Sequence, residues 1–127
     1  MENKVLYHKE GVLASFPYAF ELLETENGYE GHVKADLYAD LKVTDDNRSE
    51  ISQKLLDIPC IENSHFMLEG DHIIYRTKRM IKEISSPEEC EVLTRRPFIE
   101  DYIEAAEDLQ IISDAYEGRF LKTEFVY

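Results

Sequence analysis

Carboxylates crowd the stretch between Pro97 and Gly118, which contains no Lys, Arg or His. Its most closely spaced acids are Glu100, Asp101, Glu104, Glu107 and Asp108. On a helix, side chains three and four residues apart are neighbours, so each like-charged pair costs about 0.2–0.5 kcal/mol. A solvated helix face is the plain interpretation. The functional interpretation is a docking surface for a basic protein partner, with these five residues as its contacts. Carboxylate di-metal helices place a His three residues after a Glu, which disfavours a metal site here.

A basic cluster lies in the middle of the chain and comprises Arg76, Lys78, Arg79 and Lys82. In an extended segment Arg76, Lys78 and Lys82 share one face. This pattern favours the wet side of an edge strand or of a half-exposed strand, and at an edge the charges would also discourage aggregation. The alternative is a contact for an anion or an acidic peptide, although no Gly-rich loop or helix start stands beside the cluster.

The residue types that perform catalysis do not form a recognisable set. His65 and His72 stand near two carboxylates and could bind zinc, but their spacing matches no metal motif, so ordinary strand histidines are favoured. Cys60 precedes His65 by five residues without a nucleophile elbow, and the phosphate-binding loop motifs are missing. We therefore expect no catalytic residue, cofactor or metal, and a small enzyme of unknown chemistry stays a third class of function.

Length and composition bound the class of protein. The chain has 127 residues, 43% of them apolar, and a formal net charge of −13. These values favour a single globular domain over residues 1–127 and disfavour direct nucleic acid binding, which needs excess Lys and Arg. No apolar run is long enough to span a bilayer, and no secretory signal is visible. A cytoplasmic protein with Cys60 and Cys90 reduced is expected.

The clearest predicted element is a long strand over residues 33–43, because apolar and polar residues alternate there without interruption. Such alternation buries one face and leaves the other wet, which favours an antiparallel or mixed sheet. Residues 4–9 predict a short strand that turns at Glu10-Gly11. Residues 119–126 alternate weakly and predict a last strand.

The segment 15–26 fits two structures. As a strand it places alternate large apolar residues on one face. As a helix it has Ser15 as a cap and Pro17 in the first turn, and this interpretation is favoured. The following Asn27-Gly28 pair suits either a hairpin turn or a helix end.

The remaining chain is expected to contain helices and one hairpin. These are a helix over 50–56 capped by Ser49, a hairpin over 65–81, a helix starting at Ser86-Pro87, and a main helix over 97–116 that ends at Gly118. Leu56 and Ile103 are predicted to face inward from the first and last of these helices.

Together the elements predict an α+β fold, in which a single antiparallel or mixed sheet packs against a long C-terminal helix and one or two shorter helices. From Ser15 to Tyr116 the order is a capped helix, a long amphipathic strand, a short helix, a hairpin and a long acidic helix. This order resembles the type III secretion chaperones and their relatives outside secretion. The resemblance implies a small, cytosolic, non-catalytic chaperone or adaptor that is commonly a dimer.

The leading hypothesis is a non-catalytic protein-binding module, chaperone- or adaptor-like, with a protein as its partner and no membrane or direct nucleic acid contact. A homodimer is expected from the resemblance. Such a chaperone needs an exposed apolar groove or strand edge for an extended client. The alternative is an acidic inhibitor or immunity-type protein that masks a basic, nucleic-acid-binding partner, and it predicts salt-dependent association.

Overall fold

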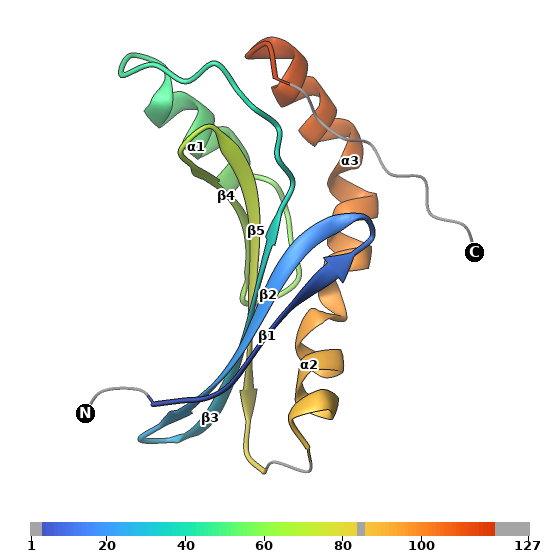
Figure 1. Ribbon diagram of the computed structural model, residues 1–127. Coiled ribbons are helices and arrows are strands. Elements are labelled where there is room, and N and C mark those ends of the chain that lie inside the picture. Colours follow the sequence, from blue (N-terminus) through green and yellow to red (C-terminus); the bar gives the residue numbers. More distant parts are fainter. Residues whose placement is uncertain (1–3, 84–85, 119–127) are drawn as a thin grey trace.

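Residues 4–83 and 86–118 are described by the structure, a computed structural model, and they form an α+β fold (Figure 1). Five antiparallel strands make one sheet in the order β1-β2-β3-β5-β4. The strands are β1 (Lys4–Leu13), β2 (Phe16–Thr25), β3 (Gly28–Asp36), β4 (Ser64–Glu69) and β5 (His72–Ile81). The helices are α1 (Arg48–Leu56), α2 (Pro87–Arg95) and α3 (Pro97–Ala115). The predicted fold class is therefore confirmed.

One face of the sheet carries the hydrophobic core. Figure 1 shows α2 and α3 along one side of the strands, and alternate strand residues on that side join the inner faces of the three helices in one cluster. Its largest fully buried members are Phe16, Phe20, Phe66, Tyr75, Phe98 and Tyr102. The strand residues between them point to the opposite face. Within the described ranges, no helix has the length and apolar character needed to cross a membrane.

The segment 15–26 is strand β2, so the favoured helix was wrong and the strand alternative is confirmed. Its apolar row is almost completely buried, with exposures from 0 to 5% at Phe16, Tyr18, Phe20 and Leu22. Burying each such side chain contributes about 1.5–3 kcal/mol, whereas a helix cap contributes about 1 kcal/mol. Pairing with β1 on one side and β3 on the other therefore outweighs the local helix signals.

The first hairpin turns later than predicted. Strand β1 passes straight through Glu10-Gly11 and ends at Leu13. The turn is made by Ala14 and Ser15, which both have positive φ angles of 51° and 71°, as the two central residues of a type I′ turn do. The second turn is made by Glu26 and Asn27, one residue before the predicted pair, and Gly28, with a φ of 127°, is the first residue of β3.

In the segment 33–43, which was predicted to be one long strand, strand pairing ends earlier than the alternation of buried and exposed residues. Ladder pairing of β3 stops at Asp36, yet alternate residues stay buried as far as Leu41. Tyr38 and Asp40 adopt left-handed φ angles of 61° and 44°, which interrupt the pleat. The segment still follows the start of β5, because Leu37 N–H donates to the Ile73 carbonyl at 2.9 Å.

The three helices predicted after residue 48 are present, with ends that differ from the prediction. The hairpin of β4 and β5 and the capped start of α2 are confirmed, since Ser86 Oγ accepts from the Glu89 N–H. Helix α1 starts at Arg48 rather than after Ser49. Two residues predicted to face inward are exposed, Leu56 by 52% and Ile103 by 41%, because each lies at the margin of its helix's apolar stripe.

Helix α3 ends at Ala115. The left-handed residue that terminates it is Glu117, one residue before the predicted Gly118. Glu117 has the left-handed φ of 55°, and the Gly118 N–H donates to the Ser113 carbonyl at 2.7 Å. Gly118 is needed for a close approach instead, since an added Cβ would lie 2.4 Å from the Ala39 carbonyl oxygen. The predicted strand over 119–126 lies outside the described residues.

Candidate functional site

The face of the sheet opposite the core is hollowed. A cavity of about 580 Å³ crosses β2, β3, β5 and the start of β4. Its charged and protonatable lining residues are Glu21, His32, Lys34, His65, Arg76 and Lys78. Small and apolar groups, Ala19 and Leu23 among them, line the β2 side. We call this cavity the open-face hollow, and its size is within the range of ligand-binding pockets.

Strand register gathers the cations of this hollow. Lys34 on β3 lies directly opposite Arg76 on β5, and Arg76 lies opposite His65 on β4. Two residues along, His32 lies opposite Lys78. Strand β5 lies between β3 and β4, so Arg76 and Lys78 lie on the wet face of a half-exposed inner strand, which is one of the two expected settings, and not on an edge strand. The register depends on pairing between segments that are distant in the sequence, so a local residue pattern does not reveal it.

Nearby carboxylates compensate part of this charge. Lys34 Nζ lies 2.6 Å from one oxygen of Glu69, and the Arg76 guanidinium lies 3.6 Å from the other. The hydrogen bond from Lys34 lowers the pKa of Glu69. Glu21, the carboxylate that lines the hollow, lies 3.3 Å from a ring nitrogen of His8 on the edge strand β1. The hollow therefore holds three permanent cations and one carboxylate on a chain whose net charge is −13.

The acidic residues of α3 divide into two kinds. Glu100, Glu104, Glu107 and Asp108 are exposed, as a docking surface requires. Asp101 is only 3% exposed; its carboxylate accepts a hydrogen bond from Tyr75 Oη at 2.7 Å and another from the Ile61 N–H at 3.0 Å. Asp101 is therefore a structural link between α3, β5 and the segment before β4. The other four remain predicted partner contacts.

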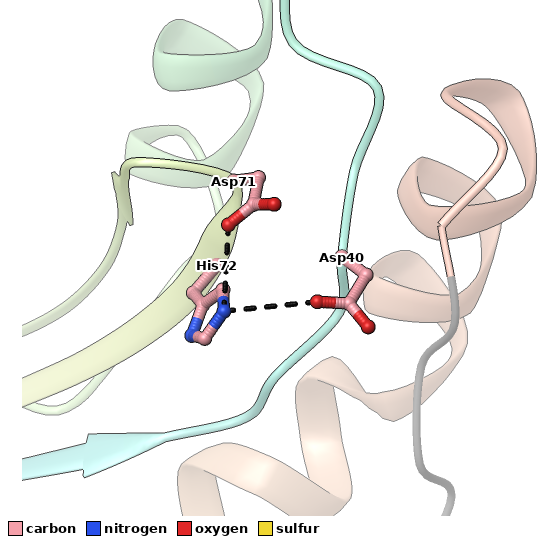
Figure 2. A group of neighbouring side chains, drawn as sticks. All are labelled: Asp40, Asp71 and His72. Carbon is pink, nitrogen blue, oxygen red and sulfur yellow. Dashed lines mark ion pairs between the residues drawn. The ribbon is translucent and has the colours of Figure 1, made fainter.

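His72 stands among carboxylates, as Figure 2 shows for Asp40 and Asp71. Its Nε2 lies 3.7 Å from Asp40 and 3.4 Å from Asp71, and its Nδ1 lies 3.0 Å from Asp36. The hydrogen bond with Asp36 raises the pKa of His72, burial opposes it, and the three negative charges reinforce it. One ligand atom from each of Asp40, Asp71 and His72 fits within 4.8 Å, as a metal site would need. A protonated imidazole, however, satisfies the same carboxylates with both of its N–H groups.

The two histidines considered together for zinc are far apart. His65 pairs opposite Arg76, whereas His72 pairs opposite Glu69. Four strand positions separate them, which is about 14 Å at 3.4 Å per residue. They cannot share one ion. Burial, together with the charge of Asp101, raises the pKa of Cys60 to about 11, and burial also raises the pKa of Cys90. Thiols of this kind are weak nucleophiles at neutral pH.

A second ionic cluster, which sequence reasoning missed, lies beneath α2. Glu91 is 2% exposed on the core side of the sheet and accepts hydrogen bonds from Lys9, Tyr18 and Arg95. Burial raises the pKa of Glu91, but the hydrogen bonds from Tyr18 and Lys9 outweigh burial, so the pKa is lowered. In sequence Glu91 looks like one more acid on a helix surface. Its i+4 neighbour Arg95 is the local partner, whereas Lys9 and Tyr18 come from β1 and β2 and cannot be recognised from the sequence around Glu91.

No family model, curated protein or solved structure matches this chain. A proposal for the function must therefore rest on the chain's own residues. In the open-face hollow, charged and protonatable side chains from four strands surround one cavity.

Proposed function

We propose that this chain is a non-catalytic protein-binding module, chaperone- or adaptor-like, and that it holds an extended segment of a partner protein in the open-face hollow. The observation that carries this proposal is the hollow itself: about 580 Å³ across four strands, on the face opposite the core. An extended peptide suits a pleated surface, because its side chains follow the same two-residue period as the strands below.

The state of the other polar clusters supports a binding role. The Glu91 carboxylate is surrounded by its own cations and a tyrosine. His72 is held by Asp36, and Asp101 by two donors. Glu91 and Asp101 are buried among partners within the chain, whereas a general base or nucleophile must reach a substrate.

The proposal is tested by comparing the proteins that the wild-type chain and a variant with a filled hollow capture from the native cell's lysate. Ala19 lines the hollow on β2, and Ala19→Phe adds a ring there. Ala115→Phe, at the exposed end of α3, is the matched control. We expect a protein that binds the wild type and Ala115→Phe but not Ala19→Phe, with the purified pair then showing the same order of affinities. If all three chains recover the same proteins with equal affinity, the hollow is not the binding site.

The acidic inhibitor is a second candidate function, and the exposure of Glu100, Glu104, Glu107 and Asp108 favours it. Exposed like charges on one helix create a field that steers a basic partner. This candidate predicts a basic protein recovered at low salt and lost at high salt. It also predicts that Glu104→Gln with Glu107→Gln weakens capture while Ala19→Phe does not.

A further inference from the structure

The open-face hollow carries an electrostatic cost within the folded chain. Like charges placed directly opposite each other on neighbouring strands are destabilising. Here Lys34 faces Arg76, the pair of permanent cations in the hollow, while Arg76 also faces His65, and Lys78 faces His32, whose ring lies 3.1 Å from Glu30. Glu69 offsets part of the first pair, while the Lys78 side chain is exposed at the floor of the hollow. An anionic ligand would relieve this repulsion.

The basic side chains are spread in a pattern that fits an extended chain. The cations Lys34 and Arg76 form one row across the strands with His65, and the cation Lys78 forms a second row with His32. The rows lie two residues apart along each strand, which is about 7 Å. Alternate side chains of an extended peptide are separated by the same distance. Carboxylates at positions i and i+2 of a bound segment would therefore lie over Arg76 and Lys78.

A small anion fits this surface less well. Strands lie about 4.8 Å apart, so the row from β3 through β5 to β4 extends over about 10 Å. Phosphate sites in proteins converge backbone N–H groups at a helix N-terminus or nest. In the open-face hollow the lining groups come from strand side chains and from residues 63–64 at the start of β4.

From the register, the charge and the row spacing, we infer that the open-face hollow takes an extended, acidic segment of the partner protein with carboxylates at alternate positions. The inference rests on the proposed function and specifies its partner chemistry. It also gives the basic cluster of β5 a role: Arg76 and Lys78 on the open face contact the segment, while Arg79 and Lys82 lie outside the hollow.

The test uses the full chain and synthetic peptides of about ten residues, long enough to cover one strand. One peptide alternates Glu and Thr, a second has the same composition with all Glu in one block, and a third alternates Lys and Thr. We expect the Glu-Thr peptide to bind best. Arg76→Gln with Lys78→Gln should weaken it about tenfold, as expected for the loss of two partly exposed ion pairs. Arg79→Gln with Lys82→Gln, an equal change of charge on the same segment, should weaken it less than about twofold.

Several outcomes overturn the inference. Equal binding of the alternating and block peptides refutes the spacing, and equal losses in the two double variants refute the site. Displacement of the peptide by inorganic phosphate alone, at equal concentration, points to a small-anion site. Salt-sensitive self-association that disappears in Arg76→Gln with Lys78→Gln identifies a second copy as the occupant. If Ala19→Phe abolishes partner capture while no acidic peptide binds, the proposed function stands and its acidic preference is refuted.

Discussion

Replacing Asp101 by Ala tests whether this carboxylate of α3 stabilises the fold or serves as a contact for a partner. The two oxygens of this buried carboxylate accept from Tyr75 Oη at 2.7 Å and from the Ile61 N–H at 3.0 Å. Tyr75 is fully buried, so its hydroxyl cannot reach bulk water and would keep only the neighbouring Ser64 and Thr77 hydroxyls as weaker partners. A buried donor left without an acceptor costs about 1–3 kcal/mol. Two such donors, one of them only partly buried, give an expected loss of about 2–4 kcal/mol in the free energy of unfolding.

Urea unfolding followed by far-UV circular dichroism measures this loss, because the chain has no Trp to serve as a fluorescent probe. The matched control is Glu104→Ala, which removes the same charge less than one helical turn away at an exposed position. We expect the control to stay within about 0.5 kcal/mol of the wild type. Coinciding unfolding midpoints for the two variants, with unchanged slopes, would show that the Asp101 hydrogen bonds do not support the fold.

Three further predictions follow from close contacts and pKa shifts. An added Cβ at Gly31 would lie 2.2 Å from Thr94 Oγ1, so Gly31→Ala should cost about 1–3 kcal/mol; adding Thr94→Ala should restore part of this stability, and strictly additive losses would contradict the clash. Because Asp36 raises the pKa of His72, their pairing should stabilise the fold fully below about pH 6.5, the unfolded value, and lose this effect as pH rises through the folded pKa. Urea unfolding at several pH values should show a smaller pH-dependent component in Asp36→Asn than in the wild type, because Asp40 and Asp71 remain near His72; identical pH profiles would refute the prediction. With its pKa raised to about 11, Cys60 should react with iodoacetamide far more slowly at pH 7 than an unfolded thiol, and equal rates by mass spectrometry would contradict its burial.

Local patterns in the sequence were sufficient for several elements. Gly70 has a φ of 63° at the tip of the β4–β5 hairpin, a conformation that glycine adopts without strain. Ser86 caps α2 as its spacing to Glu89 predicts. The alternation over 33–43 correctly predicted which residues are buried as far as Leu41. Each of these features depends on residues within a few positions of one another, so the chain itself contains the needed information.

Features that depend on distant segments could not be predicted in this way. The strand at 15–26 was mistaken for a helix because its cap signals are local, while the burial and pairing that decide its structure involve β1, β3 and the helices. Asp101 was assigned to the docking surface because its donors, Tyr75 and Ile61, are distant in sequence. The buried Glu91 was missed for the same reason.

The sequence by itself therefore determined the α+β class, the acidic character, the β4–β5 hairpin and the starts of α2 and α3. The tertiary structure decided which charges are buried and which meet at the open-face hollow. The physical reason is the strand register: a cation on β3 becomes the neighbour of one on β5 only when hydrogen bonds align strands that are some forty residues apart in the chain, and that alignment follows from packing of the whole core.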